Sequence, residues 1–538
     1  MTTAVSISHE RTARKRPFPC RQNHLGRSVV TSSHNSFMRV PTVPLSMQIS
    51  DSVVVVGGGF GGLSTACYLA DAGVDVTLLE KNEQLGGRAS RLEAEGFRFD
   101  MGPSWYLMPD VFERFFGHFD REPSDYYSLT RLDPHYRVFW KDGDRLDVNG
   151  DREAMAEVFE EYESGAGDAL ESYLGTSAEH YDVAMNKFVY TDRPRLRDWV
   201  DLDVMRAAPI GLQLLGTMDD YVADYFEHPK LQQLMQYTLV FLGGAPNNTP
   251  ALYNMMSHVD FNLGVYYPDG GLGAVVDACV ELGEELGVEY VTDAEVSEIV
   301  RRKDGFVVES AAGDFEADRV VSNADYAHTE QELLPEHERG YDADYWEDRT
   351  YAPSAFLLYM GVEGDVEQLE HHTLVLPTDW DHHFEQIFDD PEWPEDPAYY
   401  LCVPSKTDDT VAPEGHSNLF ALVPIAPGLD DTEETRAWYR DLILEDIADN
   451  TGVDLRDRIV FEEQFCVSEF SDRYNSMKGT ALGMAHTLRQ TALLRPPHRS
   501  KACPDLYFTG SYTTPGIGVP MCLISGQHTA DAVIEDAT

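Results

Sequence analysis

The stretch from Val53 to Glu80 restricts the fold of this chain more than any other. It opens on four consecutive valines, which is the composition of a buried parallel strand. Gly57, Gly59 and Gly62 follow in the spacing G-x-G-x-x-G, and small apolar residues at helical spacing come next. A second apolar run ends at Glu80, 18 residues after Gly62. This order of strand, glycine turn, helix, strand and acid predicts a dinucleotide-binding βαβ unit.

The spacing of such a unit has a physical reason at each position. Gly57 permits a sharp turn, Gly59 lets the backbone approach a pyrophosphate, and Gly62 lets the helix pack closely on the strand. Free N–H groups at the start of the helix attract the anion. The Glu80 carboxylate can accept the hydroxyl hydrogens of an adenosine ribose and would repel a 2′-phosphate. The alternative interpretation is a glycine-rich loop in an ordinary α/β domain.

The charge of the 538-residue chain is strongly acidic. It carries 93 acidic and 41 basic residues, a formal net charge of −52. With 43% hydrophobic and 11% aromatic residues the chain is not disordered, so the acids must coat a folded surface. Because salt screens such self-repulsion, we infer a salt-loving source with a salty cytoplasm. The acids are spread along the chain, which disfavours a single patch for a basic partner, and the charge argues against nucleic-acid binding.

Cysteine spacing and hydropathy exclude several other classes. The seven cysteines form no C-x-x-C and no paired spacing, so we expect reduced core residues and neither a disulfide framework nor a metal site. The histidine pairs at 371–372 and 382–383 have no ligand pattern around them, and we expect them in surface loops. The sequence contains no run of about 18 apolar residues, so we expect no transmembrane helix.

Residues 1–46 differ from the rest of the chain in the sign of their charge. They hold seven basic residues against one acid, Glu10, and contain no apolar segment typical of a secretory signal. We expect an over-extended translation start, with Met47 as the working N-terminus, or a disordered extension if the segment is made. A basic arm that contacts a membrane surface is the alternative.

Two further motifs follow Glu80 closely, L-G-G-R at 85–88 and F-D-M-G-P-S at 99–104. With the βαβ unit they resemble the FAD-dependent amine oxidase and carotenoid desaturase superfamily. The resemblance implies that the first motif lies along the FAD pyrophosphate and flavin edge, and that the second lies close to the isoalloxazine. The residues so implied are Gly86, Gly87, Arg88, Gly102, Pro103 and Ser104.

The segment 510–520 resembles the closing FAD motif of the same superfamily, G-x-x-T-x-P-G-x-G-x-P. The resemblance implies that a helix from Met521 points its positive end at the flavin edge where negative charge gathers on reduction. It also implies that backbone near Val296 contacts the adenine. Gly510, Pro515, Gly518 and Val519 complete the implied cofactor residues. FAD is the only nucleotide cofactor expected.

We therefore predict an α/β fold, with a Rossmann-like FAD-binding domain that is discontinuous in sequence and a mixed α+β substrate domain. Residues 51–120, 263–328 and 481–538 are assigned to the FAD-binding domain, and 121–262 and 329–480 to the substrate domain.

The substrate domain includes a helical part with three unusually apolar pieces. By default these form helix core faces; the alternative is an apolar entrance that dips into one leaflet of a membrane. The pieces are Ala207–Gly216, Leu231–Gly244 and Thr249–Met256.

The segment from Val403 to Ser417 resembles bacterial-type phytoene desaturases. This resemblance implies an FAD-dependent oxidoreductase that desaturates a carotenoid hydrocarbon, in the first place phytoene towards lycopene, by hydride transfer to flavin N5. The implied surroundings are the cytoplasm at the inner face of the cell membrane, with the membrane surface as substrate reservoir and a quinone or oxygen as electron acceptor. Candidate proton acceptors, each with a structural role as the alternative, are Tyr106, His258, Asp260 and Tyr512.

Four other functions are compatible with parts of this pattern. A desaturase of a later carotenoid intermediate, such as a hydroxylated C50 precursor, would have the same motifs. A carotenoid isomerase would use the same FAD fold without net oxidation. An amine oxidase is disfavoured because Lys81 is the only lysine in the flavin motifs. A non-catalytic carotenoid carrier would not need intact motifs at both ends of the chain.

Overall fold

The computed structural model describes residues 51–193, 197, 216–487 and 489–538. The basic extension predicted for 1–46 lies outside the described residues. So do 207–215, which make up nearly all of the first apolar piece.

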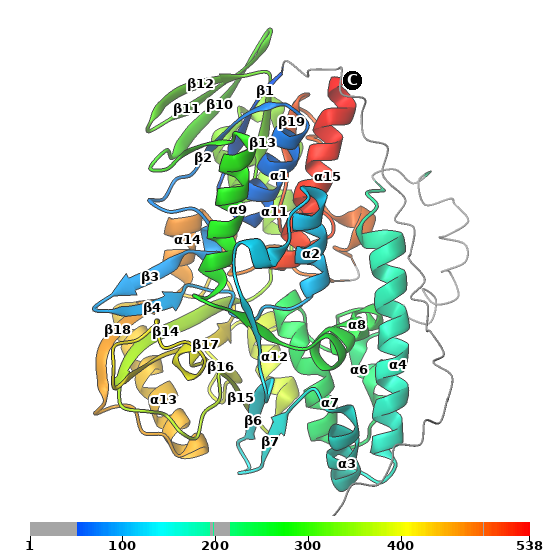
Figure 1. The fold of residues 1–538 in the computed structure, drawn as a ribbon, viewed down its shortest axis with the longest axis vertical. Coiled ribbons are helices and arrows are strands. Elements are labelled where there is room, and N and C mark those ends of the chain that lie inside the picture. Colours follow the sequence, from blue (N-terminus) through cyan, green and yellow to red (C-terminus); the bar gives the residue numbers. More distant parts are fainter. Residues whose placement is uncertain (1–50, 194–196, 198–215, 488) are drawn as a thin grey trace, which may run out of the picture. The chain divides into compact units, whose positions relative to one another are not determined.

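Five parallel strands form the sheet that the opening motif predicts (Figure 1). The valine run lies in the middle strand and is hydrogen-bonded on both sides, which explains why it is apolar throughout. The strands come from three distant parts of the chain. In spatial order they are β19 (Leu506–Phe508), β13 (Arg319–Ser322), β1 (Ser52–Val56), β2 (Asp75–Leu79) and β9 (Glu289–Val291).

Both faces of this sheet are covered. Val53 and Val55 pack against three helices, whereas Val54 and Val56 pack against a small antiparallel sheet. The alternation follows from the two-residue repeat of a strand. The helices are α1 (Phe60–Asp71), α9 (Leu272–Leu286) and α15 (Val519–Ala537), and the small sheet consists of β10 (Val296–Arg302), β11 (Gly305–Ser310) and β12 (Gly313–Ala317). This confirms the predicted α/β, Rossmann-like domain.

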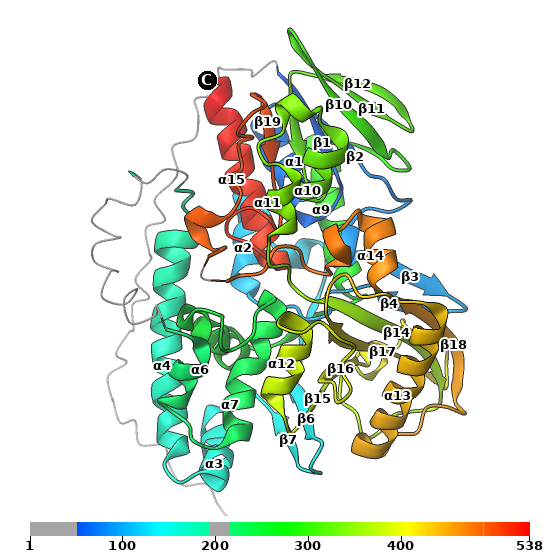
Figure 2. The same cartoon turned by 180° about the vertical axis from the view of Figure 1, so that it is seen from behind.

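A second, seven-stranded sheet forms the other half of the molecule (Figure 2). It is mixed, because β6 and β15 pair in parallel while the other pairs are antiparallel. In spatial order the strands are β18 (Ile459–Phe465), β14 (Ser354–Glu363), β17 (His416–Ile425), β16 (Tyr399–Cys402), β15 (His372–Leu376), β6 (Tyr136–Trp140) and β7 (Arg145–Val148).

Helices cover both faces of the seven-stranded sheet. On one face, Phe356 and Leu358 of β14 pack against α13 (Glu433–Thr451). On the other face, Ala355 and Leu357 join a core that includes a helical layer. That layer contains α3 (Arg152–Tyr162), α4 (Ala166–Ala184), α6 (Met218–Ala223) and α7 (Pro229–Gln236). Both surfaces of the sheet are therefore buried along most of its strands.

Shorter elements connect these layers. They are β3 (Arg91–Ala94), β4 (Phe97–Asp100), α2 (Pro109–His118), β5 (Leu129–Arg131), α8 (Met255–Ser257), β8 (Tyr266–Pro268), α10 (Tyr326–His328), α11 (Ala343–Glu347), α12 (Trp380–Phe388) and α14 (Val467–Tyr474).

The two described apolar pieces pack mostly inward. Leu231, Leu234 and Leu239 belong to the core, whereas Leu252 is exposed. The six cysteines among the described residues are free thiols. In the described part of the chain, no helix has both the length and the apolar character required to cross a bilayer.

The structure corrects the prediction for the histidine pairs. His371 and His372 are buried at the start of β15, and His383 is buried in α12; only His382 is exposed. A strand covered on both faces buries consecutive side chains, so two adjacent histidines need not indicate a surface loop.

Candidate active site

A cavity of about 900 Å³ lies where the five-stranded and seven-stranded sheets approach each other. Part of its wall consists of the turn after β1, the L-G-G-R and G-P-S turns and the loop before α15. The remainder comes from strands of the seven-stranded sheet and from the helical layer. All predicted cofactor residues except Gly62 line it, so the structure brings together motifs from both ends of the described chain.

Gly62 lies behind the wall and has the packing role predicted for it. A Cβ at this position would lie 2.1 Å from the carbonyl oxygen of Gly57, which is not sterically possible. Gly57 itself has a φ of +101°, a backbone conformation that favours glycine. The turn between β1 and α1 therefore requires both glycines, and it directs the start of α1 towards the cavity.

Glu80 is buried and fixed in orientation at the cavity wall. One carboxylate oxygen accepts a hydrogen bond from the N–H of Gly58 at 2.7 Å, and the other accepts from the N–H of Asn82 at 2.9 Å. The second oxygen also accepts from the side-chain amide of Asn82 at 2.8 Å, whereas the oxygen bonded to Gly58 can accept one further hydrogen bond. The position after β2 thus holds an acceptor for ribose hydroxyl groups beside the glycine turn.

Arg88 has a buried donor that is not satisfied within the described protein. Its Nη2 donates to the Ser476 hydroxyl at 2.5 Å and to the Thr480 carbonyl at 3.3 Å. Its Nε is buried and has no hydrogen-bond partner. An unpaired guanidinium N–H in a cavity wall costs free energy unless an acceptor lies against it, and an anionic ligand would supply one.

The loop before α15 is held by a residue that sequence reasoning missed. Arg495 is buried and donates to the backbone carbonyls of Ser511, Tyr512 and Thr513. Burial lowers the pKa of Arg495 to about 10. Its position after a loop and before two prolines gave no motif by which it could have been found. The buried arginine fixes the loop that places Pro515 and Gly518 at the cavity.

Asn323, in the segment V-V-S-N-A-D at 320–325, was likewise not predicted. It follows β13, lines the cavity, and its N–H donates to the carbonyl of Val56 at 2.7 Å. Its side chain lies so close to Gly59 and Gly510 that a Cβ at either glycine would approach within 3.0 Å. Asn323 therefore links the three chain segments that form the motif side of the wall.

Comparison with known proteins supports this geometry. A family model described as flavin containing amine oxidoreductase matches residues 60–534. The chain belongs to this family. A second model, for pyridine nucleotide-disulphide oxidoreductases, matches residues 12–97.

Two curated relatives align with this chain over nearly the whole length of each relative. A carotenoid 3,4-desaturase of Haloarcula japonica is 76% identical over 487 residues, which is 90% of this chain and 98% of the relative. A 4,4′-diapophytoene desaturase of Staphylococcus haemolyticus is 31% identical over 502 residues, 90% of this chain and 99% of the relative. A crystal structure of an oxidoreductase from Methanosarcina mazei is similar in fold, with a TM-score of 0.58, 16% identity, and coverage of 89% of this chain and all of that one.

FAD is the cofactor of this flavin-dependent oxidoreductase, and the residues at the cavity fit it. The unpaired Nε of Arg88 offers a donor to a pyrophosphate, Glu80 offers an acceptor to a ribose, and the glycine turns leave backbone accessible. α15 begins at Val519, two residues before the predicted start at Met521. Gly518 and Val519 both line the wall, so the free N–H groups at the start of the helix can face the flavin.

The rest of the wall is mostly apolar and carries no sequence motif. It combines side chains from α4, from the short helices around 240–259, and from β14, β15 and β17. A surface of this kind binds an apolar ligand by excluding water from it. Its members include Met185, Val240, Met255, Val259, Leu357, Leu374 and Leu422.

None of the four candidate proton acceptors is among the residues that line this cavity. The buried hydroxyl of Tyr106 bonds to that of Tyr127 at 2.9 Å. Tyr512 is buried as well and donates to Asp325 at 2.6 Å. His258 bonds to Asn262 at 2.8 Å.

Asp260 accepts hydrogen bonds from two tyrosines, Tyr136 at 2.8 Å and Tyr237 at 3.0 Å. Burial raises the pKa of Asp260 to about 7. An acceptor must reach the reacting carbon, so the positions of Tyr106, His258, Asp260 and Tyr512 favour structural roles.

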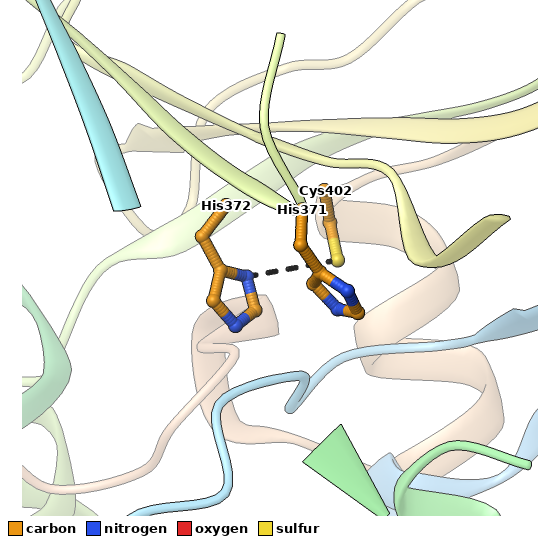
Figure 3. Close-up of side chains that lie close together, drawn as sticks. All are labelled: His371, His372 and Cys402. Carbon is orange, nitrogen blue, oxygen red and sulfur yellow. Dashed lines mark hydrogen bonds between the residues drawn. The ribbon is translucent and has the colours of Figure 1, made fainter. Parts of the chain in front are cut away.

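The cavity wall does contain another polar group that the sequence did not reveal. Ser104 and Tyr400 both line the cavity, and their hydroxyl groups lie 2.9 Å apart. The Tyr400 hydroxyl also lies 2.6 Å from Nδ1 of the buried His372. Figure 3 shows His372 with its neighbours His371 and Cys402. Only Ser104 was predicted, because its partners lie about 270 to 300 residues further along the chain.

Proposed function

We propose that the chain is an FAD-dependent carotenoid 3,4-desaturase, which converts the C3–C4 single bond of a carotenoid end into a double bond. The observation that carries this proposal is the 76% identity to the Haloarcula japonica carotenoid 3,4-desaturase along nearly the full length of that relative. The cavity supports it, because motif residues that fit FAD and an apolar wall line the same cavity.

The wall suits such a substrate for a simple reason. A carotenoid hydrocarbon offers no polar group along most of its length, so it must be held by apolar burial and shape. When bound, FAD supplies the acceptor for a hydride and its electron pair. The residues around it then have two tasks, which are to align one C–C bond and to keep water away from it.

Phytoene, converted towards lycopene, is the second candidate substrate. The 31% identity to a diapophytoene desaturase and the segment 403–417 support this alternative. The much higher identity to a 3,4-desaturase leads us to prefer a later, already conjugated intermediate.

We further propose that the mouth of the cavity rests on the membrane surface, which acts as the substrate reservoir. Leu252, Leu493 and Leu494 have exposed fractions of 37%, 36% and 57% on an otherwise acid-rich chain. Leu252 and Leu493 also line the cavity, so part of its apolar wall is exposed to the surroundings of the protein. A membrane quinone or oxygen would reoxidise the flavin.

The decisive experiment supplies purified holoenzyme at high salt with carotenoid in liposomes. One arm contains a conjugated carotenoid that is saturated at C3–C4, and the other contains phytoene. A red shift and a product two hydrogens lighter in the first arm alone support 3,4-desaturation. Product in the phytoene arm alone would identify phytoene as the substrate and contradict 3,4-desaturation. Isomerised product from pre-reduced enzyme without an acceptor would indicate an isomerase.

A further inference from the structure

We propose that Tyr400 is the catalytic residue that takes the proton leaving the substrate, and that His372 is a positioning residue that receives the hydrogen of Tyr400. This inference rests on the proposed function, because it names the proton acceptor that desaturation requires. Neither residue was among the candidates suggested by the sequence.

The two residues are placed together by the seven-stranded sheet. His372 opens β15 and lies directly opposite Cys402 of β16, while Leu374 lies opposite Tyr400. Because alternate residues of a strand share a face, Tyr400, Cys402 and His372 lie on the same face, with Tyr400 and His372 as diagonal neighbours. The 2.6 Å contact between the Tyr400 hydroxyl and Nδ1 of His372 is therefore set by strand register.

His372 is buried in the protein interior and packed against an aromatic ring. It is fully buried, and the ring of Trp105 stacks on it with centroids 4.2 Å apart and an angle of 8° between the planes. Burial keeps the pKa of His372 well below its usual value, so the imidazole is neutral at neutral pH. In the tautomer that carries its hydrogen on Nε2, the Nδ1 lone pair accepts the Tyr400 hydroxyl hydrogen.

Tyr400 connects this buried imidazole to the cavity. Its side chain lines the cavity beside Ser104, whose hydroxyl lies 2.9 Å from the Tyr400 oxygen. Ser104 can donate to that oxygen while Tyr400 donates to His372, which gives one consistent direction of donation along the chain. Ser104 belongs to the G-P-S turn on the cofactor side of the wall, so the tyrosine lies where substrate and cofactor residues meet.

His371 and Cys402 flank His372, and the three residues offer ligand atoms within 4.8 Å of one another (Figure 3). Two hydrogen bonds favour proton transfer between Tyr400 and His372 over a metal ion bound by these three residues. Nδ1 of His372, 3.9 Å from the Cys402 sulfur, already faces the Tyr400 hydroxyl, and Nδ1 of His371 lies 2.7 Å from the Thr407 hydroxyl. A metal ion between the three side chains would compete with these hydrogen bonds.

Desaturation breaks two C–H bonds. The hydrogen at the carbon nearer the polyene would leave as hydride with its electron pair, for which FAD, when bound, would supply the acceptor. The C–H bond at the neighbouring carbon breaks, and its electron pair becomes the new π bond. That proton goes to the Tyr400 oxygen while the Tyr400 hydroxyl proton goes to Nδ1 of His372. Even a weakly basic imidazole suffices, because a polyene cation beside the breaking bond is a strong acid. The proton returns by the same route to water when product leaves.

The test compares His372→Asn and Tyr400→Phe with the wild-type holoenzyme. Asparagine keeps an acceptor for the Tyr400 hydroxyl but does not take up a proton at neutral pH. We expect the rate of product formation to fall at least 100-fold in each variant, within the range general acid–base groups supply. His383→Asn is the matched control, since His383 is buried and has two unpartnered ring nitrogens but does not line the cavity.

Isotope effects distinguish proton transfer from a merely structural role. With substrate deuterated at the carbon that loses the proton, the isotope effect should rise in both variants, because that step becomes slow. Variants that retain FAD and keep either a rate within threefold of wild type or an unchanged isotope effect would overturn the proposal. So would a stoichiometric metal ion in wild-type protein that is lost in His372→Asn. If wild-type enzyme itself makes no 3,4-desaturated product, the proposed function fails instead. If a variant does not fold, the other one decides.

Discussion

The cofactor side and the substrate side of the cavity are constructed from different kinds of sequence. On the cofactor side, short glycine motifs, Glu80 and Arg88 form the wall. On the substrate side, single apolar residues from α4, the 240–259 helices and three strands form it. A dinucleotide needs backbone at fixed positions, whereas a hydrocarbon needs only apolar volume. Single substitutions should therefore have large effects on the cofactor side and smaller effects on the substrate side.

The largest effect is expected from Gly59→Val. A Cβ at Gly59 would lie 2.9 Å from the Asn323 amide nitrogen, and the rest of the valine side chain would enter the space for the pyrophosphate. We expect complete loss of bound FAD, measured by flavin absorbance of the purified protein. Gly175→Val is the control, because a Cβ at Gly175 meets no atom within 4 Å. Full FAD occupancy in Gly59→Val would contradict the placement of the cofactor.

Arg495→Met tests whether the cofactor side depends on the buried arginine that holds the loop before α15. Losing the bonds from this guanidinium to the carbonyls of Ser511 and Thr513 should release the closing loop. Two charge-assisted hydrogen bonds of about 1.5 kcal/mol each predict FAD binding weaker by roughly 100-fold. Titration of apoprotein with FAD measures this. Unchanged affinity in a folded variant would mean that the loop is held by other contacts.

The pH dependence of stability tests Asp260, a buried carboxyl group in the substrate half of the molecule. Its folded pKa of about 7 lies above the value of about 3.9 expected when unfolded. Between these values the unfolded chain releases a proton that the folded chain keeps, so the free energy of unfolding falls as pH rises from 4 to 7. Asp260→Asn should remove this fall, and relative to wild type the variant should gain about 4 kcal/mol between pH 4 and pH 8, because the two pKa values differ by about three and each pKa unit corresponds to about 1.4 kcal/mol.

Denaturant unfolding at constant high salt measures this difference. Glu157→Gln, at an exposed position of α3, is the control for removing one negative charge. A parallel pH dependence in wild type and Asp260→Asn would contradict the assignment.

The smallest effect is expected at the cavity mouth. Leu493→Ser together with Leu494→Ser removes two partly exposed leucines and should weaken liposome binding by about tenfold. Co-sedimentation at high salt measures it, and FAD content should not change. Substitution of Trp438, another exposed apolar residue that does not line the cavity, provides the comparison. Equal binding by all these proteins would argue against the proposed mouth.

The difference between the two sides also explains what the sequence could predict. The βαβ unit follows from local spacing, and the other predicted cofactor residues that line the cavity follow from the resemblance of short motifs to a known family. The cluster of Ser104, Tyr400 and His372 depends on strand register between distant segments, for which one sequence contains no signal. The two adjacent histidines at 371 and 372 were interpreted as surface residues because the coverage of both faces of β15 was not visible in the sequence.

The strand order of the five-stranded sheet has a consequence for biosynthesis. β1 and β2 are translated early, but β13 inserts beside β1 only after the helical layer has been made, and β19 completes the edge near the end of the chain. The nascent protein must therefore keep an incomplete sheet on or near the ribosome until Leu506–Phe508 has emerged. Flavin binding is then expected only after translation is nearly complete, and chains that end before β19 should yield colourless protein.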